Sequence, residues 1–388
     1  MNVAVPSGTP PPNGFPENLR LSLQQPQLPG LDALRAFAAW LVVFYHQGLA
    51  VPGDLGVLAF FVLSGFLITW LLLKEHQKYG DISLKLFYLR RALRIFPAFY
   101  LYWLAVVGLL LLFGKNLQRP QAWASFFYMT NYYQALHGHV SSGFSHTWSL
   151  AVEEQFYLLW PLGLLVLLRR KADLTRWLMG SIAAFWIWRA VLEFAIQVQE
   201  VWVYEAFDAR ADHLLMGCLL AVVLREQRAP GLFRRLCAHP ALPVVTLGVL
   251  VAEVAIGQRM GGYGARSFEF ILQPLLVAAL IVQWMAFAVH PGWRWLNWGW
   301  LVYLGKISYS TYLYQQIVPA AMKPVFNQWP MAPPIVLTLP VIVAAASASY
   351  FLVEKPFLKL KDRFGSRQTT AGGTRDSGEA AVPLRRVA

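Results

Sequence analysis

Apolar and polar stretches alternate along most of the chain, and the apolar stretches are long. Ten of them contain about 15–21 residues. A helix needs about 20 predominantly apolar residues to cross the hydrocarbon core of a bilayer. The pattern therefore predicts an all-α, polytopic integral membrane protein with about ten transmembrane helices, near residues 31–51, 55–73, 95–113, 149–168, 177–197, 210–224, 241–257, 269–289, 300–319 and 333–353.

Basic residues fall on alternating sides of these predicted helices. They gather in the connections after the second, fourth and sixth segments, near residues 74–94, 169–176 and 225–235, whereas the opposite connections hold few. Connections rich in Lys and Arg face the cytoplasm in membrane proteins. We therefore expect both termini on the cytoplasmic side of the cell's inner membrane, with the chain crossing it several times.

The two ends of the chain differ from the apolar region between them. Residues 1–29 are rich in Pro and have no apolar run after a basic start, so we expect a disordered tail and not a secretory signal. Residues 361–388 are rich in Gly, Ser, Thr and Arg, and we expect a disordered basic tail there, with no further soluble domain. Residues 30–360 form the expected membrane domain.

Composition narrows the class of protein. The 388 residues are 57% hydrophobic and only 14% charged, which excludes a disordered chain and disfavours a soluble domain. The net charge of +13 comes from short clusters between apolar segments. Basic clusters in these places set the orientation of the chain in the membrane and contact anionic lipids of the bilayer. We therefore expect no nucleic-acid partner. Cys218 and Cys237 indicate neither a disulfide framework nor a metal site.

The first apolar segment carries two ionisable side chains of interest. Arg35 and His46 are eleven residues apart, so a helix places them on one face, about 16 Å apart along its axis. The predicted orientation puts Arg35 near the cytoplasmic end and His46 in the outer half. Ionisable residues inside membrane helices usually have a functional reason.

A second basic cluster follows the second segment, in the stretch FYLRRALRIFP. It contains Arg90, Arg91 and Arg94. These residues could simply anchor a helix at the cytoplasmic surface. They could also form a phosphate clamp together with Arg35, because Arg makes bidentate contacts with phosphate.

Polar residues that could line a site recur in four other segments. Each also has a structural interpretation, such as helix packing through small residues, a favourable helix dipole or a buried network. The candidates for the site wall are Ser64, Trp148, Ser149, Tyr157, Arg210, Tyr309 and Gln315. Glu153 is a candidate partner for His46, because a carboxylate can orient an imidazole and stabilise its protonated form. His137, His139 and His146 are expected to be polar loop residues, and we expect no metal site.

Six stretches together give the chain a family resemblance. They read LDALRAFAAWLVVFYH, FFVLSGF, RRALRIFP, HTWSLAVEEQFYLLWP, ISYSTYLY and VEKPF, in this order. This order resembles the membrane acyltransferase-3 family, whose members transfer acyl groups to sugars of cell-envelope glycans, such as polysaccharide or lipopolysaccharide, and to related small molecules. The resemblance covers about residues 31–357.

The resemblance implies roles for particular residues. His46 matches the proposed catalytic base, and Glu153 lies in the Trp-Ser-Leu-x-x-Glu motif. Arg35 belongs to the Arg-x10-His motif, and the other three arginines match a cluster linked to acyl-CoA, usually acetyl-CoA, supplied from the cytoplasm. Two positions depart from the family pattern: Leu58 stands where Asp is frequent, and Gln315 where His is frequent.

The expected reaction is O-acyl transfer from acyl-CoA to a hydroxyl of a sugar or glycan on the outer side, either directly or through an acyl-histidine intermediate. The alternative is a multi-pass transporter or flippase, in which the buried polar residues form a substrate or proton path. The absence of a visible internal repeat disfavours that alternative.

Overall fold

The computed structural model describes residues 14–260, 263–326 and 335–363, and every regular element in these ranges is helical. This confirms the all-α class. In chain order the elements are α1 Glu17–Gln24, α2 Leu31–His46, α3 Gly53–Tyr79, α4 Leu84–Leu112, α5 Arg119–Phe126, α6 Thr130–His137, η1 Ser145–Thr147, α7 Trp148–Arg169, α8 Leu174–Ala190, η2 Val191–Ile196, α9 Glu200–Glu205, α10 Phe207–Arg225, α11 Pro230–Leu236, α12 Leu242–Met260, α13 Tyr263–Phe287, η3 Pro291–Asn297, α14 Gly299–Lys306, α15 Ser308–Tyr314, α16 Ile317–Phe326, α17 Ile335–Ser349, η4 Tyr350–Glu354 and α18 Lys355–Arg363.

Six helical stretches in the described part of the chain are long and apolar enough to cross a membrane. They are Gly53–Tyr79, Leu84–Leu112, Ser145–Arg169, Leu174–Ile196, Phe268–Phe287 and Ile335–Leu360. The structure therefore suits a multi-pass membrane protein, but the expected number of ten spans is not confirmed. The first expected span corresponds to α2, which has only 16 residues. The segment near 300–319 is divided among α14, α15 and α16.

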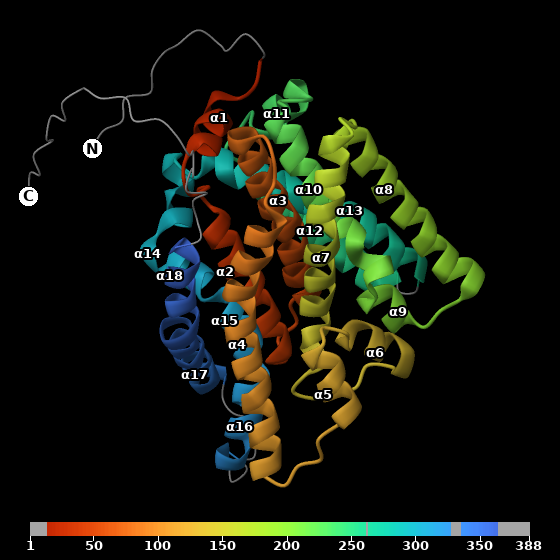
Figure 1. The fold of residues 1–388 in the computed structure, drawn as a ribbon, viewed down its shortest axis with the longest axis vertical. Coiled ribbons are helices and arrows are strands. Elements are labelled where there is room, and N and C mark those ends of the chain that lie inside the picture. Colours follow the sequence, from red (N-terminus) through yellow and green to blue (C-terminus); the bar gives the residue numbers. More distant parts are fainter. Residues whose placement is uncertain (1–13, 261–262, 327–334, 364–388) are drawn as a thin grey trace, which may run out of the picture.

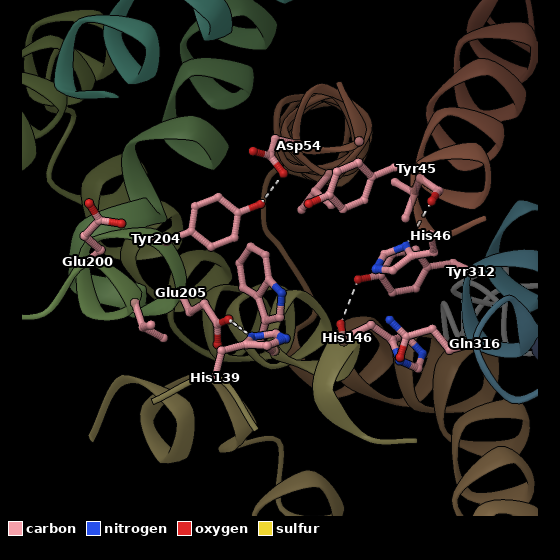
Figure 2. Close-up of a pocket in the computed structure, with 15 residues that line it drawn as sticks. Tyr45, His46, Asp54, His139, His146, Glu200, Tyr204, Glu205, Tyr312 and Gln316 are labelled. Atoms are coloured by element: carbon pink, nitrogen blue, oxygen red, sulfur yellow. Dashed lines mark hydrogen bonds and ion pairs between the residues drawn. The ribbon is translucent and has the colours of Figure 1, made fainter. Parts of the chain in front are cut away.

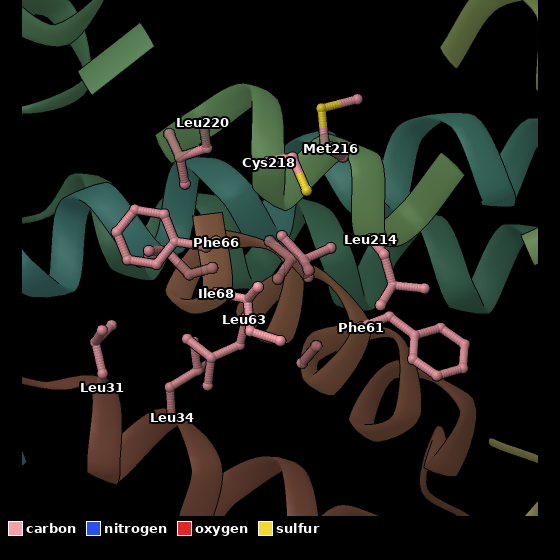
Figure 3. Packing of buried hydrophobic residues seen from close by; sticks show 14 of the residues in the cluster. Leu31, Leu34, Phe61, Leu63, Phe66, Ile68, Leu214, Met216, Cys218 and Leu220 are labelled. Carbon is pink, nitrogen blue, oxygen red and sulfur yellow. The ribbon is translucent and has the colours of Figure 1, made fainter. Parts of the chain in front are cut away.

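Two glycines bring α3 and α10 into close contact at the centre of the bundle. A Cβ atom on Gly65 would overlap the Leu214 carbonyl oxygen, and one on Gly217 would overlap the Val62 carbonyl oxygen. Small residues at these crossing points let the two backbones approach closely, as in other membrane helix pairs. Large apolar side chains of both helices fill the space on either side (Figure 3). α2 also packs against α3.

The N-terminal tail contains structure that the sequence did not predict. Residues Glu17–Gln24 form α1, and Ser22 donates a hydrogen bond to the Met285 carbonyl at the end of α13, over 2.7 Å. Phe15 packs against Phe233 of α11. The expectation of a disordered segment is therefore wrong for these residues, since their apolar face has a docking surface on α11 and α13. Residues 1–13 and 364–388 lie outside the described ranges.

The two ends of the bundle differ in their covering elements. Figure 1 shows α1 and α11 at one end and the short helices α5, α6 and α9 toward the other. α2 ends and α3 begins toward the end that α5, α6 and α9 cover, where η1 also leads into α7. α2 begins toward the end that carries α1, and Arg35 lies in its second turn (Figure 1). The geometry therefore separates Arg35 from His46 along the bundle axis.

Candidate functional site

A cavity of about 330 Å³ lies where α2 ends, and we call it the histidine cavity. Its walls come from α2, α3, α9, α15 and the segment that leads into α7. The lining residues are Val42, Tyr45, His46, Gly53, Asp54, Val57, His139, His146, Trp148, Glu200, Val201, Tyr204, Glu205, Tyr312 and Gln316. The volume falls in the range of small-molecule sites, about 300–1,000 Å³. Figure 2 shows the polar side chains converging on this space.

The protonation of His46 is fixed by its own helix. Its Nδ1 atom lies 2.9 Å from the Val42 carbonyl oxygen, one turn earlier in α2. A carbonyl oxygen only accepts hydrogen bonds, so Nδ1 carries the proton and donates it. In the neutral ring Nε2 then holds a lone pair. The side chain of Gln315 lies beside the ring, and Tyr45 packs edge-on against it. His46 is therefore oriented to accept a proton at Nε2.

His146 and Tyr312 form the floor next to His46. His146 Nδ1 lies 3.1 Å from Gln316 Oε1, and Tyr312 donates its hydroxyl proton to the His146 carbonyl over 2.7 Å. The Tyr312 hydroxyl also bonds to Ser149. Nε2 of His146 is buried, and no side-chain hydrogen bond engages it within the described ranges. A polar atom in this condition costs free energy unless a ligand or water satisfies it.

Glu200 and Glu205 lie across the cavity from His46, and Asp54 lies between Tyr204 and Tyr45 (Figure 2). Tyr204 donates a hydrogen bond to Asp54 over 2.6 Å, and His139 Nδ1 lies 2.9 Å from Glu205 Oε1. The hydrogen bond with Glu205 raises the pKa of His139, and burial raises the pKa of Glu205. Glu200 completes this wall. His46 and His146 therefore lie on one side of the cavity, and Glu200 and Glu205, with His139, lie on the other.

A second cavity of about 180 Å³, the arginine cavity, lies deeper between α2, α3, α4, α7 and α15. Its lining residues are Arg35, Val57, Phe60, Phe61, Leu63, Ser64, Leu67, Ile68, Leu71, Arg91, Arg94, Ile95, Ser149, Leu150, Glu153, Glu154, Ser308, Tyr309 and Tyr312. Its wall combines apolar side chains with three guanidinium groups and two carboxylates, those of Glu153 and Glu154. An apolar sleeve with cations at its lining suits a ligand that has a long neutral part and anionic groups.

Three of the four predicted donor-binding arginines line this cavity. Arg35 pairs with Asp32 at 3.0 Å and still faces the cavity. Arg91 stacks on the ring of Tyr157 at 3.6 Å, which fixes its guanidinium plane. Within the described ranges no ion pair engages Arg91 or Arg94. Arg90 is not among the lining residues, because Glu75 of α3 holds it at 2.8 Å.

Glu153 lies with the arginines and not with His46. It accepts a hydrogen bond from Ser64 over 2.7 Å and lines the arginine cavity, whereas His46 lines the histidine cavity. No hydrogen bond or ion pair links the two residues in the described part of the chain. Glu153 therefore contacts Ser64 directly. The carboxylate that shares a cavity wall with His46 near the end of α2 is that of Asp54. α7 places Glu153 more than one turn beyond Trp148, and only Trp148 reaches the histidine cavity.

The two cavities share two lining residues, Val57 and Tyr312. The hydroxyl group of Tyr312 lies between Ser149, which lines the arginine cavity, and the carbonyl of His146, which lines the histidine cavity. The two spaces therefore meet at Tyr312. Tyr312 therefore belongs to the wall that the two cavities share.

Three more of the predicted wall residues lie in three different places. Trp148 lines the histidine cavity, and Tyr309 lines the arginine cavity, where its hydroxyl donates to the Ile95 carbonyl over 3.1 Å. Arg210 is fully buried and its guanidinium lies 4.0 Å from the ring centre of Phe270, outside the lining of both cavities. These surroundings fit the structural interpretation of Arg210, in which it belongs to a buried network.

Several lining residues were not predicted from the sequence. No sequence motif marks Asp54, Tyr204, Glu205 or Gln316, and the sequence predicts polar loop residues at His139 and His146, yet all six line the histidine cavity. One signal was available: His146 directly precedes the Thr-Trp-Ser-Leu stretch that leads into α7. His139 and Glu205 are 66 residues apart in sequence, so no local pattern joins them.

Comparison with known proteins identifies the class. The family model described as "Acyltransferase domain" matches residues 28–354, which is most of the chain. The chain therefore belongs to the acyltransferase-3 family, as the motif order predicted.

Two relatives of the chain have names that state a function. The chain is 31% identical over 358 residues to the peptidoglycan O-acetyltransferase OatA of Listeria monocytogenes, covering 86% of this chain and 56% of that protein. It is 31% identical over 360 residues to the O-acetyltransferase OatA of Staphylococcus aureus, covering 86% and 57%. The chain thus spans little more than half the length of these relatives. No solved structure matches it.

Proposed function

We propose that this protein is an integral membrane O-acetyltransferase. It transfers an acetyl group from cytoplasmic acetyl-CoA to a sugar hydroxyl of a cell-envelope glycan on the opposite side of the membrane. The observation that carries the proposal is the meeting of two cavities of different chemistry at Tyr312. Family membership and the names of the two relatives support O-acetyl transfer, and peptidoglycan is the acceptor that those names favour.

The arginine cavity is the proposed donor site. Arg35, Arg91 and Arg94 supply cations for the phosphate groups of CoA, with charge-assisted hydrogen bonds as the main contacts. The apolar residues beside them accommodate the pantetheine arm, and the thioester reaches the junction at Tyr312. Basic connections in the sequence support a cytoplasmic entry for the donor.

His46 is the proposed general base. Its Nε2 removes the proton of the acceptor hydroxyl while the hydroxyl oxygen attacks the thioester carbonyl. The new ester C–O bond forms, the C–S bond breaks, and the CoA sulfur leaves and takes up a proton. The hydrogen bond from Nδ1 to the Val42 carbonyl keeps the ring in the required tautomer. An acyl-histidine route uses the same Nε2 atom as nucleophile.

The test is acetyl transfer by the purified full chain in lipid nanodiscs, with labelled acetyl-CoA and a glycan acceptor. General-base catalysis contributes about 10²–10⁴-fold, so His46→Ala should lower kcat by that factor with a nearly unchanged KM for acetyl-CoA. His137→Ala is the matched control, because His137 is exposed and outside both cavities. Equal loss in both variants, or full activity of His46→Ala, would contradict the role of His46. Movement of unmodified glycan without consumption of acetyl-CoA would favour a transporter.

A further inference from the structure

The protonated form of His46 needs a negative charge that its own helix does not supply. When Nε2 of His46 takes the acceptor proton, the ring becomes a cation. Nδ1 of the ring donates to the Val42 carbonyl, which is a neutral group. In a catalytic triad a carboxylate occupies this nitrogen and stabilises the imidazolium. A carboxylate that stabilises the His46 cation must therefore lie elsewhere in the histidine cavity.

Asp54 is placed for this role. It lies in the first turn of α3 and lines the same cavity as His46. Its negative charge acts on the His46 ring across the cavity. No hydrogen bond or ion pair joins the two side chains in the part of the chain that the structure describes. Asp54 therefore acts through its charge and leaves Nε2 of His46 open to the acceptor.

The carboxylate of Asp54 is held in a fixed place. The Tyr204 hydroxyl donates a hydrogen bond to Asp54 Oδ1 over 2.6 Å (Figure 2). The Tyr204 ring packs against the Trp148 ring, with 5.1 Å between their centres. The guanidinium of Arg210 lies 5.3 Å from the centre of the Tyr204 ring, and its positive charge also acts on Asp54. Tyr204 therefore connects Asp54 to two side chains that are themselves buried.

Other titratable groups of the cavity have different places and partners. His139 and His146 lie near His46, and a proton on either of them repels the His46 cation. Glu205 is committed to His139, with 2.9 Å between Oε1 and Nδ1. Figure 2 shows Glu205 across the cavity from His46. The remaining titratable side chains of the lining are Tyr45, Glu200, Tyr204 and Tyr312.

From this arrangement we infer that Asp54 is the electrostatic partner of His46, and that its charge stabilises the imidazolium formed during acetyl transfer. The inference rests on the proposed function and deepens it by naming a positioning residue for the same reaction. Asp54 takes no proton itself. The proton passes from the acceptor oxygen to Nε2 of His46 and then to the sulfur of CoA.

The sequence pattern agrees with this role. Leu58 stands where the family often has Asp, and Asp54 lies one helical turn before it on α3. Residues four apart share one face of a helix. A carboxylate is therefore present on this face of α3, one turn nearer to the start of the helix.

The first experiment measures kcat for acetyl transfer between pH 5 and pH 9, with the full chain in nanodiscs, labelled acetyl-CoA and chitotetraose as the acceptor. Asp54→Asn removes the charge and keeps the size of the side chain. Because the His46 cation loses its partner, kcat should fall about tenfold, and the pH of half-maximal kcat should move down by about one unit. Asp54→Glu keeps the charge and should leave that pH nearly unchanged. Glu17→Gln is the control, because Glu17 lies in α1 and pairs with Arg20 on the surface.

The second experiment does not depend on acetyl transfer. NMR of the protein with ¹⁵N-labelled histidine follows the titration of His46, whose signals are assigned by their loss in His46→Gln. The midpoint should fall by about one pH unit in Asp54→Asn and stay in place in Glu17→Gln. An unchanged midpoint in Asp54→Asn, even with lower activity, or an equal shift in Asp54→Glu would overturn the inference. The expected NMR shift in a protein that transfers no acetyl group would overturn only the proposed function.

Discussion

Arg94 and Arg90 allow a sharp test of the donor site, because they lie one turn apart on α4 and differ in their surroundings. Arg94 lines the arginine cavity and has no ion-pair partner within the described ranges. Arg90 is held by Glu75 at 2.8 Å and does not line the cavity. Replacing each with Gln removes the same charge. We therefore expect Arg94→Gln to weaken CoA binding and Arg90→Gln to leave it nearly unchanged.

The magnitude follows from the contacts. A hydrogen bond to a charged group contributes about 1.5–3 kcal/mol, and a loss of about 2 kcal/mol weakens binding about 30-fold. At a CoA concentration of about 100 times the wild-type Kd, binding adds about 2.7 kcal/mol to the free energy of unfolding. The same concentration would add only about 0.9 kcal/mol in Arg94→Gln.

The two variants should also differ without CoA. Arg94 lies near the positive charges of Arg35 and Arg91, so its replacement relieves repulsion and should leave the melting temperature equal or higher. Arg90→Gln loses a partly buried ion pair and should cost about 0.5–1 kcal/mol with and without CoA.

The assay is thermal unfolding of the purified protein in nanodiscs at several CoA concentrations, with the KM for acetyl-CoA measured in parallel. The reasoning is refuted if Arg94→Gln keeps the full CoA-dependent rise in melting temperature. It is equally refuted if Arg90→Gln loses that rise.

Two further predictions concern packing and pH. Gly217→Ala forces a Cβ atom into the Val62 carbonyl and should lower the free energy of unfolding by about 1–3 kcal/mol. Gly248 has open space around it, so Gly248→Ala should not destabilise the protein. Thermal unfolding of both variants checks this prediction. The hydrogen bond with Glu205 raises the pKa of His139 in the folded protein. The ion pair therefore contributes its full stabilisation below the pKa of His139 in the unfolded chain, near 6.5. This contribution is lost as the pH rises through the higher pKa of His139 in the folded protein. The melting difference between wild type and His139→Asn should therefore shrink from pH 6 to pH 9, starting from about 1 kcal/mol or less because His139 is half exposed. A difference in melting temperature that stays constant from pH 6 to pH 9 would contradict this role of the His139–Glu205 pair.

The sequence by itself determined the helical class, the membrane character and the family. The apolar run lengths are local properties, and a helix satisfies its own backbone inside a bilayer, so these features need no tertiary contact. The separation of Arg35 and His46 along one helix was also fixed by helical geometry. The role of His46 as base and of acetyl-CoA as donor stays a prediction. The α1 helix was missed because its stability depends on docking against α11 and α13.

Only the tertiary structure decided which polar residues share a cavity. Arg90, Arg91 and Arg94 are close neighbours in sequence, and each could have faced the donor site. Glu75 of α3 engages Arg90, which leaves Arg91 and Arg94 to line the cavity. Glu153 pairs with Ser64 of α3 because α7 crosses α3 at that level. The wall that faces His46 comes from α9 and from the connection between α6 and η1, and packing brings these segments together over large sequence separations. Side-chain reach is only a few ångströms, so such partnerships depend on how the helices pack, which no local pattern encodes.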